Sequence, residues 1–294
     1  MTIGRLLLLG WGLLLAAAVP LPAQQPAFRH FGLRDGLPQS QVTALLEDRH
    51  GFLWVGTNTG GIARLGASGF HAFASAQGMR ALFVRGLMED PKGSIWVASQ
   101  EGVSEVRGET VLNYGLPEGL LAGTVSALAL DGEDRVLVVN RHGLFRKEED
   151  RFWPMPLPAP WTGRPLRQVV RDRSRSLWLV DREGHIARWE GQAIKEFPLP
   201  QPFRTKKLRD FQVDLQGQVW VLLEDALFHM EKGEWVQEEL PGLARSPKAS
   251  SLRFSPRGGY LVALGGDGLL EKDAAGQTHL LDASNGLPRD RILV

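Results

Sequence analysis

Short apolar runs follow one another along the chain, and each run ends at turn-forming residues such as Gly, Asp or Asn. Between residues 42 and 73 the runs are Val42–Leu46, Phe52–Gly56, Gly61–Leu65 and Phe70–Phe73. Short runs of this kind, two of which alternate apolar and polar positions, are typical of β-strands bounded by turns. No segment of this unit offers three helical turns with one apolar face. The stretch therefore predicts four short strands.

The unit recurs along the chain as a leading Asp, a turn and an apolar strand that usually contains Trp. The leading positions are Asp48, Asp90, Asp131, Asp172, Asp214 and Ser255, spaced by 42, 41, 41, 42 and 41 residues. The copies led by Asp131 and Ser255 lack the Trp. Helical arrays share a similar period, but a repeated unit of four strands is a propeller blade. We expect an all-β chain forming a β-propeller of four-stranded blades, with six blades readable and a seventh begun.

The N-terminus has the order of a secretory signal. Met1–Arg5 carries one positive charge, Leu6–Val19 is apolar, and Pro20–Ala23 follows. The apolar run is shorter than the roughly 20 residues of a membrane span. We expect a signal peptide over residues 1–23, with Ala18 as a second candidate cleavage position and a membrane anchor as the alternative. The propeller is expected over residues 24–294. Since an exported chain without Cys has no disulfides, a large core must stabilise it.

Both ends of the expected propeller resemble parts of a blade. Phe28–Phe31 matches an outer strand, which we expect to add to the last blade and cover its edge. Gly286–Val294 parallels Gly36–Ala44, the start of the first blade. This parallel predicts that the sequence stops inside a seventh blade, so that the full protein has seven. A natural closure with six blades is the alternative.

Two repeated columns have a structural and a chemical interpretation. The Trp column could be a sugar platform, but its aliphatic flanks favour packing between blades. It consists of Trp54, Trp96, Trp178 and Trp220. The leading Asp column could bind metal, but its fixed place before a turn favours capping of backbone N–H groups. We predict structural roles for both columns.

Charge and motifs exclude several functions. The chain has 34 Lys+Arg against 33 Asp+Glu, whereas nucleic-acid binders usually carry a basic excess. The seven His share no spacing of a metal site, and no His-Glu-x-x-His, phosphate loop or nucleophile elbow occurs. We predict no catalytic residue, metal or cofactor in this chain.

A third column points to a recognition surface. Five residues before each leading position, at the start of an innermost strand, stand Thr43, Arg85, Ser126, Arg167, Arg209 and Ser250. Loops between second and third strands lie at the same mouth of the central channel. The ligand-binding candidates are Arg85, Arg167, Arg209, Asn58, His142 and Arg182. Arginines around one mouth suit a carboxylate or sulfate. The alternative is that they pair with Asp210 and neighbouring loop acids.

The best copies of the unit resemble a known family. Asp-x-x-Gly-x-Leu-Trp-Val-Gly-Thr followed by Gly-Ile, at Asp48–Thr57 and Gly61–Ile62, is similar to the two-component regulator propeller repeat. Asp90–Ser99 and the loop Asp35–Pro38 match it as well, and the resemblance weakens after the second blade. The family implies a periplasmic sensor, typically with two propellers, an Ig-like domain, a membrane helix and a histidine kinase or diguanylate cyclase output. Those later parts belong to a longer parent protein.

The resemblance leads to a functional hypothesis. We expect an exported, periplasmic ligand-sensing domain of a two-component type protein, which binds a small anionic molecule or a saccharide. Its parent is expected to be anchored in the inner membrane through a C-terminal region outside this sequence. Whether the protein forms a homodimer is left open. The alternatives are an exported lyase or glycosidase and a protein-interaction scaffold. Neither Tyr114 nor Tyr260 lies in the mouth column, as such an enzyme would favour.

Overall fold

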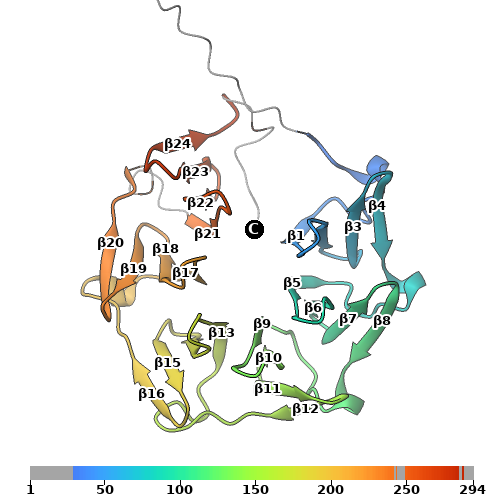
Figure 1. The fold of residues 1–294 in the computed structure, drawn as a ribbon, viewed down its shortest axis with the longest axis horizontal. Coiled ribbons are helices and arrows are strands. Elements are labelled where there is room, and N and C mark those ends of the chain that lie inside the picture. The colour runs from blue at the N-terminus through green and yellow to red at the C-terminus, as the bar shows by residue number, and fades with distance from the viewer. Residues whose placement is uncertain (1–28, 242, 244–248, 285–286, 288–294) are drawn as a thin grey trace, which may run out of the picture.

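Six four-stranded antiparallel sheets stand around a central channel like blades, with the first strand of each blade innermost and the fourth outermost (Figure 1). This is the arrangement in a computed structural model, which describes residues 29–284 except 242 and 244–248, together with residue 287. The expected signal peptide lies outside the described residues. The all-β propeller predicted from the repeat is confirmed.

The first three blades follow the expected register. Blade 1 comprises β1 (Val42–Glu47), β2 (Leu53–Thr57), β3 (Ile62–Gly66) and β4 (Gly69–Phe73). Blade 2 comprises β5 (Val84–Glu89), β6 (Ile95–Ser99), β7 (Val103–Arg107) and β8 (Thr110–Tyr114). Blade 3 comprises β9 (Ala127–Leu130), β10 (Val136–Asn140), β11 (Gly143–Glu148) and β12 (Arg151–Pro154).

The last three blades repeat this order. Blade 4 comprises β13 (Leu166–Arg171), β14 (Leu177–Asp181), β15 (Ile186–Glu190) and β16 (Ala193–Glu196). Blade 5 comprises β17 (Leu208–Val213), β18 (Val219–Leu223), β19 (Leu227–Glu231) and β20 (Glu234–Glu238). Blade 6 comprises β21 (Ala249–Phe254), β22 (Tyr260–Leu264), β23 (Gly268–Lys272) and β24 (Thr278–Leu281).

Helical structure in the described part of the chain is short. The three-residue 3-10 helices are η1 (Leu33–Asp35), η2 (Ser75–Gln77), η3 (Leu116–Glu118) and η4 (Phe203–Thr205), and a further stretch includes Pro241 and Leu243. None of the helices there is long and apolar enough to cross a bilayer. Arg29–Phe31, part of the expected outer strand, lie outside any strand, and the Phe31 ring packs edge-on against Phe70 at 5.6 Å between centroids.

Five hydrophobic cores fill the five contacts between successive blades. In the second strand of a blade, the Trp column faces the following blade and the next residue faces the preceding one. Trp54 therefore shares a core with Val97, and Trp96 shares one with Val138. The same relation joins Trp178 to Val221 and Trp220 to Val262, while Leu137 replaces Trp against Leu179. The structural interpretation of the Trp column is correct.

The leading Asp joins the turn to the Trp. Its Oδ1 accepts backbone N–H groups two and four residues on, for example from His50 and Phe52 to Asp48. Its Oδ2 accepts the indole N–H six residues on, a contact that the turn pattern alone did not predict. The Nε1 to Oδ2 distances are 2.8 Å for Trp54–Asp48, 2.9 Å for Trp96–Asp90, 3.0 Å for Trp178–Asp172 and 2.9 Å for Trp220–Asp214. We call this arrangement the Asp–Trp pair.

The first prediction concerns the Trp column. Trp96 is 1% exposed, so Trp96→Ala should lower the free energy of unfolding by about 3–5 kcal/mol, as buried Trp truncations do. Trp153 on β12 is 52% exposed, and Trp153→Ala is the matched control, with an expected loss below about 1 kcal/mol. Urea unfolding of both variants tests this. Equal losses would show that the Trp column does not hold the blades together.

The second prediction concerns acid. Burial acts to raise the pKa of Asp48 and Asp172, but hydrogen bonds from the paired Trp, from backbone N–H groups and, at Asp172, from Ser174 outweigh it and lower that pKa. A carboxyl whose folded pKa lies below its unfolded value of about 3.9 stabilises the fold above that pH, and this contribution is lost as pH falls through the folded pKa.

Asp172→Asn should therefore cost about 1–3 kcal/mol at neutral pH, because an amide N–H then faces the Trp178 N–H. The variant should also lose less stability than the wild type between about pH 5 and about pH 3. Urea unfolding across this range, with the exposed turn residue Asp150→Asn as control, is the measurement. Parallel pH profiles for wild type and Asp172→Asn would contradict the assignment.

Candidate functional site

Strand direction divides the propeller into two faces. The leading Asp turns lie at one end of the sheets, and we call the opposite end the upper face. It carries the loops between second and third strands and the connections from each fourth strand to the next blade. Because strands alternate in direction, all six candidate residues lie at or near this face, as expected from sequence.

The arginine column coincides with an irregularity of the sheets. In β5, β13 and β17 the pairing to the second strand skips one residue, which is Arg85, Arg167 and Arg209 respectively. The same bulge occurs at Thr43 in β1 and at Ser250 in β21. A bulge leaves one residue unpaired and turns its side chain away from the regular alternation. These side chains are therefore aimed by the backbone and not only by their place in the repeat.

Arg167 links blade 4 to blade 5. Its guanidinium donates Nη1–H to the Leu208 carbonyl at 2.5 Å and Nη2–H to the Arg209 carbonyl at 2.6 Å. Burial lowers the pKa of Arg167, and the Asp210 carboxylate partly offsets this effect. Both outer nitrogens of the guanidinium thus bind the inner strand of the next blade. The structure gives this arginine an internal partner that neither sequence interpretation named, since the alternative expected acids.

Arg209 and Asp210 are also engaged within the propeller. Arg209 Nη2 lies 3.0 Å from Glu224 Oε2, on the loop after β18, as the pairing alternative expected. Asp210 Oδ2 accepts the Leu252 N–H at 3.0 Å and Arg253 Nη1–H at 2.8 Å. This carboxylate therefore connects blade 5 to blade 6. Within the arginine column, Arg167 thus serves a contact between blades, whereas Arg209 is paired within blade 5.

The remaining candidates make fewer side-chain contacts within the propeller. Arg85 is exposed and has no hydrogen bond or ion pair within the described ranges of the chain. Asn58 donates Nδ2–H to Gln41 Oε1 at 3.1 Å, in the loop of its own blade. Arg182 is exposed, and its backbone N–H donates to the Pro165 carbonyl at 3.0 Å. Of the six candidates, only His142 lines the pocket between blades 3 and 4, and Arg182 contacts one of its lining residues, Pro165.

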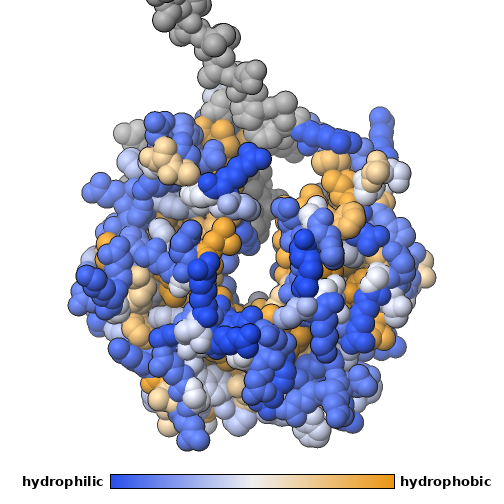
Figure 2. Space-filling view, viewed as in Figure 1, coloured by the Kyte–Doolittle hydropathy of each residue, from blue (hydrophilic) through white to orange (hydrophobic). Residues whose placement is uncertain are grey.

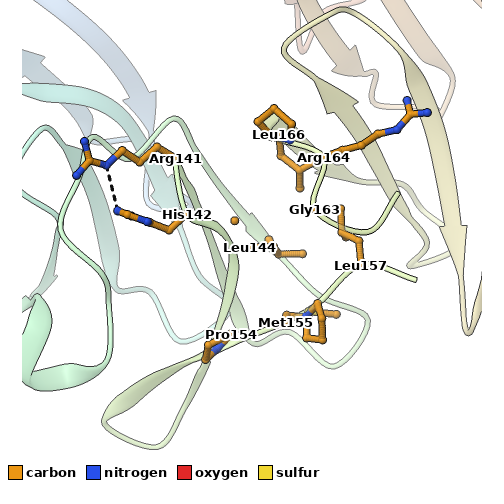
Figure 3. Close-up of a pocket in the computed structure, with 12 residues that line it drawn as sticks. Arg141, His142, Leu144, Pro154, Met155, Leu157, Gly163, Arg164 and Leu166 are labelled. Carbon is orange, nitrogen blue, oxygen red and sulfur yellow. Dashed lines mark hydrogen bonds between the residues drawn. The ribbon is translucent and has the colours of Figure 1, made fainter. Parts of the chain in front are cut away.

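That pocket lies on the upper face between blades 3 and 4 and has a volume of about 270 Å³. One wall is the loop Arg141–Gly143, and the other is formed from the connection Pro154–Leu166 (Figure 3). Leu144, Leu157 and Leu166 give it an apolar floor. Its volume is near the lower end for small-molecule sites, so it suits a small ligand.

The second wall is rigid. Residues 154–165 include five prolines and replace the loop that contains Gly78-Met79 after blade 1 and Gly119-Leu120 after blade 2. Trp161 is 0% exposed and donates its indole N–H to Glu196 Oε1 at 2.9 Å. Thr162 Oγ1 donates to the Leu157 carbonyl at 3.0 Å. The prolines and the buried Trp161 limit the conformations of this wall. Ligand binding therefore loses little conformational entropy in ordering it.

The rim of the pocket is cationic. Arg141 is exposed, and its Nε lies 3.0 Å from His142 Nε2 (Figure 3). His142 Nε2 also lies 3.1 Å from the Ala122 carbonyl, and the tautomer decides which of the two contacts is a hydrogen bond. Arg141 Nη1 and Nη2 have no partner within the described ranges of the chain. Arg164 is 3.3 Å from Asp181 Oδ2 and is thus partly neutralised. Arg141 therefore supplies the accessible positive charge.

One group of possible metal ligands borders this region. Among the described residues, ligand atoms of Asp181, Glu183 and His185 lie within 4.8 Å of one another. His185 Nδ1 is 2.7 Å from Asp181 Oδ2, the same oxygen that Arg164 approaches. The Arg164 guanidinium and the His185 imidazole already contact this Asp181 oxygen, so we do not propose a metal site here.

The sequence candidates did not include Arg141 and Arg164, although Arg141 lies ten residues after Asp131, as Asn58 and Arg182 lie ten residues after Asp48 and Asp172. The signal that points to them is the cluster of prolines after β12, where the chain lacks the Gly of the first loops; a second such cluster, Pro198–Pro202, follows β16. A departure from the repeat on one face of a propeller frees that loop for binding.

The sequence matches the family model described as "Two component regulator propeller" over residues 36–59. This segment holds the loop before β1, β1 itself and the strand with the first Asp–Trp pair. No curated protein matches the chain.

Solved structures share the fold. The extracellular domain of a protein described as the hybrid two component system BT3049 from B. thetaiotaomicron has a TM-score of 0.69 and 15% identity, covering 90% of this chain and 38% of that chain. A similar domain of BT4673 from the same organism has a TM-score of 0.64 and 12% identity, covering 83% and 36%. The present chain thus spans less than two fifths of either relative.

Virginiamycin B lyase from Staphylococcus aureus has a TM-score of 0.66 and 12% identity, and the match covers 82% of this chain and 84% of the lyase. At such identities the likeness shows the fold alone. The repeat pattern, the six blades and the match at residues 36–59 agree. The chain is a β-propeller in which residues 36–59 match the two-component regulator propeller repeat.

Proposed function

We propose that this propeller is the periplasmic ligand-sensing domain of a two-component type signalling protein, and that it binds a small anionic ligand in the pocket between blades 3 and 4. The observation that carries the proposal is Arg141. Its guanidinium stands at the rim of a preformed apolar pocket with its two outer nitrogens unpartnered among the described residues. A guanidinium stays charged at physiological pH and offers paired donors to a carboxylate.

The side chains of the pocket favour an anion over a saccharide. Sugars bind on open aromatic faces, but Trp161 is fully buried and its indole N–H is bound to Glu196. The repeated Trp residues are packed between blades and are equally closed to a ligand. The floor is instead aliphatic, from Leu144, Leu157 and Leu166. A small acid with an apolar body fits both features.

An exported lyase remains the second candidate, because a lyase structure shares the fold over most of its length. Such an enzyme needs a general base, and an accessible Tyr is one candidate for that role. Burial and hydrogen bonding to Glu105 raise the pKa of Tyr114, and burial beside Glu238 raises that of Tyr260. Both phenols are buried and hydrogen-bonded to these carboxylates. Neither is suited to act as a base, which supports the sensor.

Sensing requires that the ligand binds one arrangement of the protein more tightly than another. The pocket joins two blades, since Arg141 and His142 come from blade 3 and Leu166 begins blade 4. A ligand that bridges them stabilises one relative position of these blades. That bias is the signal a parent protein would pass through the membrane.

The third prediction tests the ligand class with phenylacetate, its neutral isostere phenylacetamide, and galactose, each titrated into the chain by calorimetry. Phenylacetate should bind and the other two should bind at least tenfold more weakly. Arg141→Ala should weaken phenylacetate by about tenfold, which is about 1.4 kcal/mol, because the exposed charge is partly screened. Binding of phenylacetate should also weaken with added salt.

The control variant is Arg257→Ala, which removes an exposed arginine at the opposite face of the propeller. It should leave the phenylacetate titration unchanged. Tighter binding of galactose than of phenylacetate would replace the anion by a saccharide. Equal loss of affinity in Arg141→Ala and Arg257→Ala would remove the pocket as the site.

A further inference from the structure

Blade 3 contributes no Trp to its contact with blade 4, because Leu137 stands where blade 2 has Trp96. The surroundings of Trp96 show what this position normally holds. Its neighbours are an acid that accepts the indole N–H, a polar partner across the sheet, an aromatic ring at the end of the fourth strand, and two residues of the next blade. In that order they are Asp90, Glu105, Tyr114, Val136 and Lys147.

The same five positions around Leu137 are held by residues of blades 3 and 4. Arg146 pairs with Leu137 across the sheet, and the Met155 N–H donates to the Leu144 carbonyl at the end of the blade. In the order given above, the five residues are Asp131, Arg146, Met155, Leu177 and Trp189. All five line one pocket of about 550 Å³ at the end of the leading Asp turns, opposite the upper face. We call it the lower pocket, and it occupies the place that an indole has in blade 2.

The lower pocket is distinct from the apolar wall of the channel. Figure 2 shows apolar side chains (orange) exposed along that wall, beside the central opening. Arg146 on β11 and Trp189 on β15 instead belong to third strands, which lie farther from the channel than the first strands (Figure 1). The lower pocket therefore lies between two neighbouring sheets, which can enclose a flat ring from both sides as they enclose each repeated Trp.

The walls of the lower pocket suit a flat, uncharged ring. Met155 and Leu177 are apolar, and Trp189 is held in place because its indole N–H donates to the Gly191 carbonyl at 2.9 Å. Such side chains pack well against an aromatic face. The charges in the lining balance, with three arginines and three acids: Arg135, Arg146, Arg175, Asp131, Glu133 and Glu190. Unlike the rim at Arg141, this lining favours a ligand without net charge.

Asp131 offers the acceptor that a ring N–H needs. Its Oδ1 caps the turn by accepting the Arg135 N–H, and its Oδ2 accepts Arg135 Nε–H at 2.7 Å. This oxygen can take a second donor, because Asp172 Oδ2 accepts both the Trp178 Nε1–H and the Arg188 Nε–H at 3.0 Å. Asp131 is buried, so water competes little for a hydrogen bond to its carboxylate.

We propose that the lower pocket binds a neutral aromatic heterocycle with a ring N–H, of the size of indole. The ring takes the place that Trp96 has in blade 2 and packs against Met155 and Trp189. Its N–H donates to Asp131 Oδ2. A ligand bound in this way joins blades 3 and 4 as each repeated Trp joins its own blade to the next. The lower pocket differs from the pocket proposed for the anion in charge and in face, so this proposal is independent of that one.

The fourth prediction compares indole with benzofuran, which has the same shape but an oxygen in place of the N–H, each titrated into the chain by calorimetry. Indole should bind, and benzofuran should bind about tenfold more weakly, because it offers Asp131 no donor. Leu137→Trp should abolish indole binding and raise the urea midpoint of unfolding, since its own indole fills the lower pocket. No binding of indole to the wild type, equal binding of benzofuran, or unchanged indole binding in Leu137→Trp would overturn the proposal.

A second pair of variants keeps the test decisive if Leu137→Trp folds poorly. Trp189→Ala removes one wall and should weaken indole binding about tenfold, whereas Trp153→Ala, outside the lower pocket, should leave it unchanged. Arg141→Ala should also leave it unchanged, which separates this site from the anion site. Met155 lines both pockets and is therefore kept in every variant. Equal losses in Trp189→Ala and Trp153→Ala, or loss of indole binding in Arg141→Ala, would place the ligand elsewhere and contradict the proposal.

Discussion

The hydrogen bond between a leading Asp and a Trp six residues later stabilises four of the six described blades and their contacts with the next blade. Neighbouring blades must be filled by large side chains, and an indole fills the space well but carries an N–H that is costly to bury unpaired. The carboxylate that caps the turn accepts this N–H, so one residue satisfies the turn and the core together. In blade 6 both partners are replaced, by Ser255 and Leu261. In blade 3 Leu137 replaces Trp, and Arg135 Nε takes the second oxygen of Asp131 at 2.7 Å.

The sequence suggested that the arginines at the mouth of the channel bind a ligand. Contacts within the propeller instead engage Arg167 and Arg209. Arg167 reaches the carbonyls of Leu208 and Arg209, and Asp210 reaches the next blade in turn. Polar side chains are needed there because the inner edge of each first strand has backbone groups that its own sheet does not pair. Arg85, Arg141 and Arg182 remain exposed, and of these only Arg141, beside the proline-rich wall, lines the pocket proposed for the ligand.

The repeat determined what could be predicted from sequence. Strand positions, blade count, the buried Trp column and the turn-capping Asp all follow from local patterns that recur with one period. The partners of Arg167 did not, because a backbone carbonyl has no sequence signature and any residue can supply it. The pocket of Arg141 and Leu144 was missed for a related reason, since it forms where a loop of blade 3 meets the connection to blade 4, and no local pattern shows that contact. Resemblance to a family indicated the repeat but not these contacts.

The Asp–Trp pair is tested most directly by a double-mutant cycle at Asp90 and Trp96, which are 2.9 Å apart and both buried. Asp90→Asn removes the acceptor that faces the indole, and Trp96→Phe removes the N–H while keeping an aromatic ring. Urea unfolding of wild type, both single variants and the double variant gives their coupling free energy. The account predicts a favourable coupling of about 1 kcal/mol or more. Additive effects within about 0.3 kcal/mol would show that the two side chains act independently and would contradict it.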